Sequence, residues 1–246
     1  MKIKKISGII LVRSDSKRLP NKCFLDFGKV NILEHIIKRC LHYEITPIIC
    51  TTSLKSDIKI VKIAKKLNVL YYCGSTKNKI LRISNCCKKF NVETFHTIDA
   101  DDPFFCGNEV KRSMKYLTSL SLDIVEPTVV SSKGSGTVGY SVKSDVFHRL
   151  SKKIKINTDT EMMWNFFKKL VNIKIKRLSK SKFDCNARLT LDYPEDYIFL
   201  ESIRLLLGNL TSRKNICTLL KKNPNLTKIN YFRNKEWKRN QIIKQN

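Results

Sequence analysis

The sequence predicts an α/β fold in which a mostly parallel sheet is flanked by helices. Nearly continuous apolar runs, such as 6–12 and 46–52, alternate with segments whose apolar residues recur at helical spacing. Strands this apolar are typical of parallel sheets, in which helices cover both faces. The chain has 246 residues, of which 42% are hydrophobic, so a single domain can fill a core.

The first half of the chain predicts a regular alternation. Strands are expected at 6–12, 46–52, 69–73 and 92–98, and helices at 31–43, 56–67, a stretch that ends near Phe90, and 108–118. Asn31 and Glu34 form the pattern of a capping box at the start of the first helix. Right-handed βαβ units would join these strands into one sheet.

The second half is less regular. Its elements are expected as short strands at 123–129 and 137–142, a helix at 159–169, a strand at 172–178, and a strand at 187–191 that leads into a helix at or next to Pro194. The sequence contains no internal repeat and no long linker. We therefore expect a single domain over residues 1–246, with an excursion at about 123–178 and a basic C-terminal tail at 224–246.

Positive charge dominates the composition. Lys and Arg number 48 against 21 Asp and Glu, a net charge of +27. One interpretation is a surface that binds nucleic acid or another polyanion, and the other is compositional drift, because Lys, Ile and Asn are abundant together. Lysines are spread over nearly every predicted helix, which favours drift and predicts no specific nucleic-acid binding. The densest basic and aromatic segment, 228–246, is expected to be a solvated end or a final helix.

Cysteine usage and hydropathy indicate the cellular compartment. None of the nine cysteines forms a C-x-x-C pair, so neither a zinc site nor a redox motif is indicated. Buried free thiols are typical of the reducing cytoplasm. No apolar run approaches the roughly 18 residues that span a membrane. A cytoplasmic protein without membrane insertion is the expectation.

The loop RSDSKRLPNK follows the first predicted strand and therefore lies at the carboxyl edge of the sheet, where α/β proteins bind ligands. Arg13, Arg18 and Lys22 repel one another there unless an anion joins them, and a polyphosphate suits them. Ser14 and Ser16 add hydrogen-bond donors. The alternative is an exposed basic loop paired with scattered carboxylates. The loop matches neither a P-loop nor a dinucleotide-binding fingerprint.

Five sequence blocks between Ile9 and Phe199 resemble, in order, the cytidylyltransferases that make CMP-sugars. These enzymes include CMP-Kdo synthetase, acylneuraminate cytidylyltransferase and the SpsF-like spore-coat polysaccharide proteins. The similar blocks are R-x-x-S-x-R-L-P-x-K at 13–22, FGKVNILEH, YYCGSTKNKILRI with Gly74, Ser75 and Arg82, IDADDPFF with Asp101 and Pro103, and RLTLDYPEDY with Asp192.

The resemblance implies a GT-A-like nucleotidyltransferase fold with a Rossmann-like sheet. It implies transfer of CMP from CTP to a sugar, with release of pyrophosphate, for surface polysaccharides such as lipopolysaccharide. An acidic sugar of the 3-deoxy or nonulosonic type is the expected acceptor. Mg²⁺ is the expected cofactor, and a homodimer built on the 123–178 excursion is the expected assembly.

The chemistry of this transfer assigns roles to five residues. Charge develops on the departing pyrophosphate, so Arg13 and Lys22, together with Arg18, suit the β- and γ-phosphates. Asp101 and Asp192 each follow a predicted strand and would meet at the same edge, where two carboxylates can hold Mg²⁺. We therefore expect Arg13, Lys22, Asp101 and Asp192 to be catalytic. The alternatives are a helix-capping role for Asp192 and a turn role for Asp101.

The remaining nucleotide contacts are expected around the base. Thr51 and Thr52 end the second predicted strand, and the resemblance implies that their loop and Arg82 approach the cytosine or ribose, with Gly74 and Ser75 nearby. Two other functions remain open. Asp99-Ala100-Asp101 is a D-x-D sequence, as in GT-A glycosyltransferases that use nucleotide sugars, and the high charge would suit a non-enzymatic polyanion-binding protein.

Overall fold

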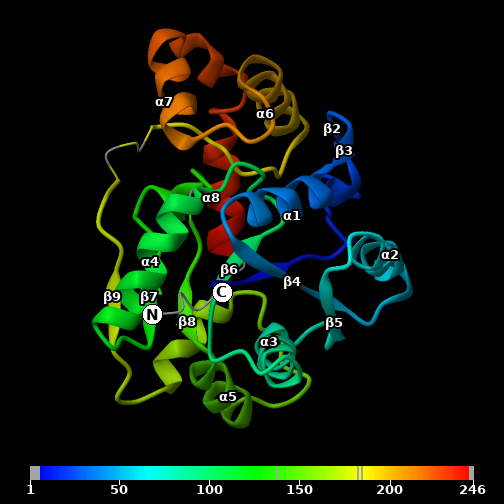
Figure 1. Cartoon of the computed structure of the whole chain (residues 1–246), viewed down its shortest axis with the longest axis vertical. Coiled ribbons are helices and arrows are strands. Elements are labelled where there is room, and N and C mark those ends of the chain that lie inside the picture. The colour runs from blue at the N-terminus through cyan, green and yellow to red at the C-terminus, as the bar shows by residue number, and fades with distance from the viewer. Residues whose placement is uncertain (1–5, 137, 182, 184, 244–246) are drawn as a thin grey trace.

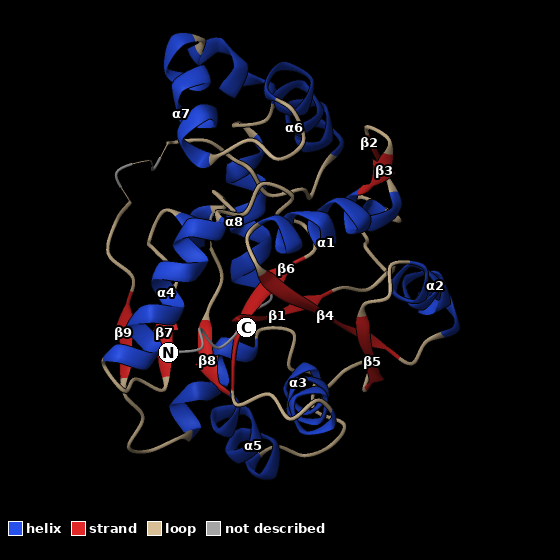
Figure 2. Ribbon diagram, viewed as in Figure 1, coloured by secondary structure: helices blue, strands red, loops and turns tan. Residues whose placement is uncertain are grey.

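A computed structural model describes residues 6–136, 138–181, 183 and 185–243. Its centre is a seven-stranded sheet in the order β5-β4-β1-β6-β8-β7-β9 (Figures 1 and 2). The strands are β1 (Ile6–Leu11), β4 (Ile45–Thr52), β5 (Leu70–Gly74), β6 (Thr94–Asp99), β7 (Ile124–Glu126), β8 (Ser141–Lys143) and β9 (Ile175–Arg177). Only β8 runs antiparallel to its neighbours, β6 and β7. The predicted, mostly parallel α/β fold is confirmed.

Helices connect the strands and cover both faces of the sheet. They are α1 (Ile32–His42), α2 (Ile58–Lys66), α3 (Lys79–Lys89), α4 (Gly107–Ser119), α5 (Ser144–Lys153), α6 (Pro194–Leu207), α7 (Arg213–Lys222) and α8 (Arg233–Ile243). Shorter 3₁₀ segments are η1 (Lys22–Phe24), η2 (Lys55–Asp57), η3 (Ser131–Lys133), η4 (Met163–Lys169) and η5 (Pro224–Ile229), and β2 (Asp26–Phe27) pairs with β3 (Val30–Asn31). The predicted capping box opens α1, because Glu34 N donates to Asn31 Oδ1 at 2.9 Å and Asn31 N donates to Glu34 Oε2 at 3.3 Å.

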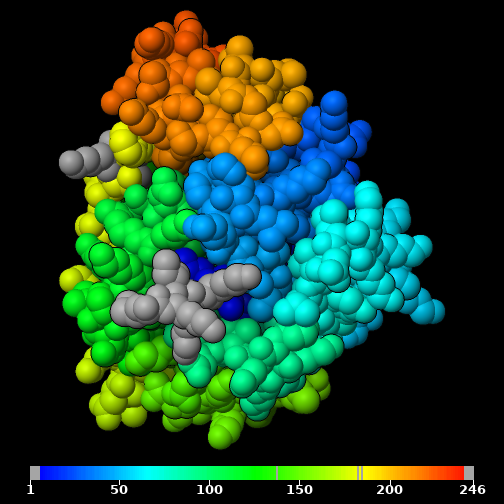
Figure 3. Space-filling view, in the orientation of Figure 1, coloured from blue at the N-terminus to red at the C-terminus, as the bar shows by residue number. Residues whose placement is uncertain are grey.

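The core has two parts, one on each side of the sheet. Side chains of β1 alternate between them, with Ile10 on one side and Ile9 and Leu11 on the other. The first part packs against α1, α2, α4, α6 and α7, and the second against α3, α5 and η4. In Figure 3, α6 and α7 form one end of the molecule, next to α1.

Three predictions about the second half need correction. Segment 159–169 is not an α-helix: only 163–169 is helical, and it is a 3₁₀ segment. Bulky side chains fix it, since Trp164 stacks on Tyr140 at 3.4 Å, and Met163 and Phe167 are buried rather than exposed. Helix α5, at 144–153, was missed.

The predicted strand at 187–191 is extended but is not part of the sheet. Leu189 N donates to Gly134 O at 3.0 Å, and Leu191 N donates to Asp101 O at 2.7 Å. The segment therefore crosses two loops instead of pairing with a strand. This connection brings the chain just before α6 to the carboxyl edge of β6.

Candidate active site

A cleft of about 980 Å³ opens at the carboxyl edge of β1 and β6. One wall is the loop after β1, with Arg13, Ser16, Arg18 and Lys22. The floor is the end of β6, and the opposite wall combines the start of α3 with segment 159–166. Asp192 and Asn240, from the last quarter of the chain, complete the lining.

The basic loop is folded back on itself at its end. Asn21 has the left-handed φ of 56°, and Lys22 N donates to Leu19 O at 3.3 Å. This turn directs Lys22 into the cleft, where its side chain is 15% exposed. Arg13, nearer the cleft mouth, has Nη2 3.5 Å from Glu161 Oε2 on the opposite wall.

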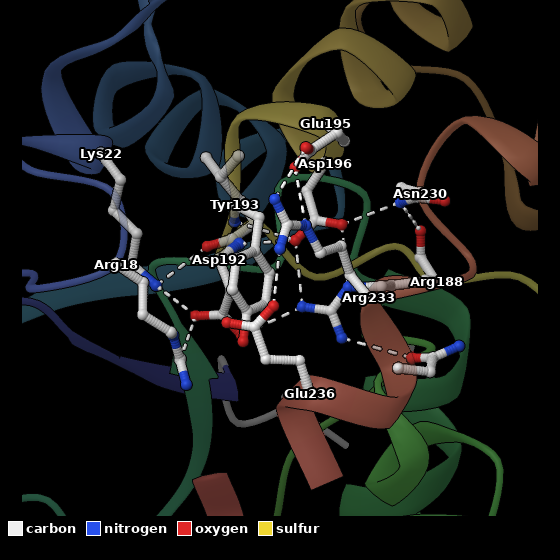
Figure 4. Close-up of polar contacts among 12 residues, drawn as sticks. Arg18, Lys22, Arg188, Asp192, Tyr193, Glu195, Asp196, Asn230, Arg233 and Glu236 are labelled. Atoms are coloured by element: carbon white, nitrogen blue, oxygen red, sulfur yellow. Dashed lines mark hydrogen bonds and ion pairs between the residues drawn. The ribbon is translucent and has the colours of Figure 1, made fainter. Parts of the chain in front are cut away.

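Lys22 joins the two aspartates that were expected to hold a metal. Its Nζ donates to Asp101 Oδ2 at 2.8 Å, to Asp192 Oδ1 at 3.1 Å and to Leu191 O at 2.9 Å. Arg18 Nη2 donates to the same Asp192 oxygen at 2.5 Å (Figure 4). The structure thus brings Arg18, Lys22, Asp101 and Asp192 together at one point.

The charges of this group stabilise one another. Burial alone would raise the pKa of Asp192, but the charges of Lys22, Arg18 and Arg188 outweigh burial and hold that pKa well below its usual range. Burial likewise opposes the charge on Lys22, but Asp101 and Asp192 raise its pKa. Asp192, Lys22 and Arg18 are therefore charged at neutral pH.

A buried ion pair behind the cleft supports Asp192, and the sequence analysis missed it. Arg188 Nε and Nη2 donate to Asp196 Oδ1 and Oδ2 at 2.8 and 3.0 Å, and Arg188 Nη2 lies 3.3 Å from Asp192 Oδ2. Asp196 Oδ2 also accepts the backbone N–H groups of Asp192 and Tyr193, at 2.9 and 3.0 Å. Arg188 and Asp196 are fully buried (Figure 4). The spacing of Arg188 and Asp196 in RLTLDYPED is the sequence feature that could have indicated this ion pair.

Three carboxyl groups cluster at the end of β6, and two of them, Asp99 and Asp101, line the cleft. Oxygens of Asp99, Asp101 and Asp102 lie within 4.8 Å of one another. Burial raises the pKa of Asp99 to about 6, Lys79 opposes this shift and Asp101 adds to it. Burial, together with Asp101 and Asp99, also raises the pKa of Asp102.

The donor set of the floor fits a hard divalent cation, which prefers carboxylate oxygens. Asp101 is 30% exposed at the cleft and can reach an ion there. Asp192 is available only if the ion replaces Lys22 Nζ, because that ammonium now lies between the two carboxylates.

Three predicted nucleotide-binding residues meet at a buried carboxylate instead of lining the cleft. Asp57 Oδ1 accepts Ser14 N and Oγ at 2.8 and 2.6 Å. Asp57 Oδ2 accepts Thr51 Oγ1 at 3.1 Å and both N and Oγ1 of Thr52. These contacts tie the start of the basic loop to the end of β4, so they hold the loop in place.

Gly74 ends β5, Ser75 follows it, and Arg82 lies on α3. Arg82 lines the cleft and its Nη1 donates to Ser75 O at 2.6 Å, while Ser75 Oγ accepts Asn78 N at 3.0 Å. A Cβ at Gly74 would lie 2.6 Å from the Tyr72 ring and 3.0 Å from Arg82 Cγ. Gly74 and Ser75 thus place Arg82 but do not themselves line the cleft.

Several cleft residues were not predicted. They are Lys79 at the start of α3, Glu161, Asn165 and Phe166 on the opposite wall, and Asn240 on α8. Thr160 anchors that wall by accepting Ile80 N at 3.1 Å. Among the described residues, no helix has both the length and the apolarity needed to cross a membrane.

The sequence is similar to known proteins. Residues 7–136, just over half of the chain, match a family described as cytidylyltransferase. An uncharacterized protein of Methanocaldococcus jannaschii is 27% identical over 234 residues, which cover 92% of this chain and 94% of that protein.

Two solved structures illustrate the similarity of the fold. A cytidylyltransferase from Leptospira borgpetersenii superposes with a TM-score of 0.77 at 22% identity, covering 91% of this chain and 96% of that one. A CMP-2-keto-3-deoxy-manno-octonic acid synthetase in complex with CTP superposes with a TM-score of 0.63 at 12% identity, covering 82% and 99%. The expected nucleotidyltransferase fold is confirmed.

Proposed function

Since the chain belongs to the cytidylyltransferase family, we propose that it transfers CMP from CTP to a sugar hydroxyl and releases pyrophosphate. The observation that carries this proposal is the convergence of Arg13, Arg18 and Lys22 with Asp101 and Asp192 in one cleft. Polyphosphate binding needs the three cations, and a divalent ion bound to the phosphates needs the carboxylates.

In the proposed reaction, the sugar hydroxyl loses its proton to solvent, its oxygen forms a bond to the α-phosphorus of CTP, and the bond from that phosphorus to the β-phosphate oxygen breaks. The leaving pyrophosphate keeps the bonding electrons, so negative charge grows on it. Arg13, Arg18 and Lys22 neutralise that charge from the loop after β1. Arg188 and Asp196 keep Asp192 in position from behind.

A divalent cation, Mg²⁺ in our proposal, would be held by Asp101 and Asp192. When bound, it would neutralise charge on the phosphates. A protein of similar fold from Mycobacterium tuberculosis, with a TM-score of 0.56 and 13% identity, is known in complex with manganese.

We place the sugar against the wall opposite the basic loop. Glu161 and Asn165 offer hydrogen-bonding groups to sugar hydroxyls, and Phe166 offers an apolar surface. The resemblance of the sequence motifs supports an acidic sugar of the 3-deoxy or nonulosonic type and a role in surface polysaccharide synthesis. Pyrophosphate would still form with another sugar, so the choice of acceptor is tested separately from the use of CTP.

The test is pyrophosphate release with CTP, Mg²⁺ or Mn²⁺, and a panel of acidic, neutral and amino sugars. ATP, GTP and UTP serve as controls, and mass spectrometry identifies the nucleotide product. The proposal predicts pyrophosphate and a CMP-sugar with CTP only. Turnover of a ready-made sugar nucleotide would instead favour a glycosyltransferase that uses Asp99 and Asp101.

A further inference from the structure

The C-terminal helix α8 forms part of the cleft wall, although its sequence has the composition of a basic tail. Asn240, near the end of the helix, lines the cleft together with Asp15 and Arg18 of the basic loop. Its Nδ2 donates to Tyr193 Oη at 3.2 Å. Tyr193 directly follows Asp192 and is 4% exposed. A single hydrogen bond thus connects the end of the chain to the centre of the candidate active site.

The ring of Tyr193 lies among three guanidinium groups. The Cζ atoms of Arg233, Arg188 and Arg18 are 4.9, 5.4 and 5.5 Å from the ring centroid. Cations within about 6 Å of an aromatic centroid are attracted to its face. Figure 4 shows Tyr193 between Arg18 on one side and Arg233 on the other. The position of the ring therefore influences where the Arg18 guanidinium lies.

One face of α8 fixes this arrangement. Arg233, Trp237 and Asn240 follow the spacing i, i+4, i+7 and share a side of the helix. Arg233 Nε and Nη2 donate to Glu195 Oε2 and Oε1 at 3.0 and 2.8 Å, and Arg188 Cζ lies 5.7 Å from the Trp237 ring. The first turn of α8 is thus joined to the start of α6, and Asn240, farther along the same helix, lies at the cleft.

We infer that Asn240 and Tyr193 are positioning residues for the triphosphate, because they assist Asp192 in holding Arg18 where the β- and γ-phosphates would bind. The inference rests on the proposed use of CTP. Arg18 is 25% exposed and has a long side chain. Without the Tyr193 ring in its present orientation, more of its rotamers would be accessible, and ordering them on binding would cost affinity.

The test compares two variants that remove the same hydrogen bond from opposite ends. Asn240→Ala and Tyr193→Phe should each weaken CTP binding about fivefold, the size expected when one freed arginine side chain must be ordered on binding. The double variant should bind CTP no more weakly than either single variant, because each single variant already lacks the same hydrogen bond. Asn240→Asp should weaken CTP binding further, since it adds a negative charge to the cleft. Lys235→Ala, on the same helix but outside the cleft, is the control.

CMP binding distinguishes the proposed positioning role from a merely structural role. CMP lacks the β- and γ-phosphates, so both single variants should bind CMP as the wild type does, although the lost hydrogen bond should lower their melting temperatures by about 2–4 °C. Equal losses for CTP and CMP, or wild-type CTP affinity in both variants, would overturn the inference while leaving the proposed function intact. A wild-type protein that binds no CTP in calorimetry would refute the proposed function itself.

Discussion

The ammonium of Lys22 lies 3.1 Å from Asp192 Oδ1, so a cation of the protein itself already neutralises a carboxylate assigned to a divalent ion. Asp101 contacts the same ammonium at 2.8 Å. A metal ion held by these carboxylates, as we propose, would therefore compete with Lys22 for the same oxygens as long as no phosphate is present to attract Lys22 away.

Replacing Lys22 tests this competition. Lys22→Met should raise the affinity of the nucleotide-free protein for Mn²⁺, because the ammonium no longer occupies the carboxylates. It should lower the affinity for CTP, because a cation that binds the phosphates is lost. Calorimetric titrations with each ligand measure the two effects. Lys17→Met removes the same charge from the same loop and should not increase Mn²⁺ binding. Weaker Mn²⁺ binding by Lys22→Met would contradict the competition.

The two carboxylates should act mainly on turnover. Asp101→Asn and Asp192→Asn should each lower turnover by on the order of 10², as expected for loss of a preorganised electrostatic group. CTP binding without metal should persist, because a negative charge beside the phosphates is removed. Steady-state rates and metal-free titrations measure both, and Asp15→Asn, also in the cleft, is the control. An Asp192→Asn variant with normal rate and metal dependence would show that Asp192 binds no metal.

Arg188 should be important for stability. Arg188→Met leaves Asp196 buried without its cation, and breaking a buried ion pair in this way costs about 3–5 kcal/mol. The double variant Arg188→Met/Asp196→Asn should lose less, because the buried charge is also removed. Urea unfolding followed by circular dichroism gives the free energies. An equal decrease in the free energy of unfolding in the single and double variants would contradict a role for the unpaired charge.

Buried His96 predicts acid sensitivity. His96 Nε2 accepts Gly139 N at 3.1 Å and its Nδ1 lies 2.8 Å from Ser141 Oγ, so the neutral ring satisfies both contacts. Burial lowers the pKa of His96 to about 3. Since the unfolded ring has a pKa of about 6.5, the contribution of His96 to stability is complete above that pH. It is lost at about 1.4 kcal/mol per pH unit as the pH falls toward 3.

His96→Gln should therefore flatten the decline of the free energy of unfolding between pH 6.5 and about 4, relative to the wild type. Urea unfolding at several pH values in this window gives the slopes. His42→Gln, which replaces an exposed histidine, should leave the slope as it is. An unchanged slope in His96→Gln would mean that other groups cause the acid sensitivity.

A homodimer built on residues 123–178 remains our proposal. Val171 is 72% exposed, and Ile175 on the edge strand β9 is 42% exposed. An edge strand with exposed apolar side chains is suited to pair with a second copy. Light scattering at micromolar concentration should give a dimer for the wild type and a monomer for Ile175→Lys. Leu205→Lys, on the exposed side of α6, is the control, and a monomeric wild type would refute the proposal.

The elements that the sequence predicted well are those specified locally. The apolar runs of β1, β4 and β6 and the capping box at Asn31 depend only on neighbouring residues. The extended segment at 187–191 was misinterpreted because its partners, Gly134 and Asp101, are distant in sequence. Helix α5 was the exception, since Val146, Phe147 and Leu150 give it a detectable apolar face.

The candidate site shows the same division. Arg18, Lys22, Asp101 and Asp192 lie in recognisable motifs, and the structure brings them together. Ser14, Thr51 and Thr52 have the donors expected of nucleotide ligands, but only the fold shows that they all donate to Asp57. The contact of Asn240 with Tyr193 joins two helices without a shared motif, so nothing local could predict it.

The contacts of Lys22 also constrain when the site can form during synthesis. Lys22 binds Leu191 O across 169 residues, and Arg18 binds Asp192 across 174. Most strands of the sheet precede residue 143, but domains generally fold as units, and the core on one side of the sheet includes α6 and α7. The basic loop must then wait for the last quarter of the chain. A nascent or prematurely terminated product would therefore lack Asp192, and the cations clustered in its loop would stay uncompensated by that carboxylate.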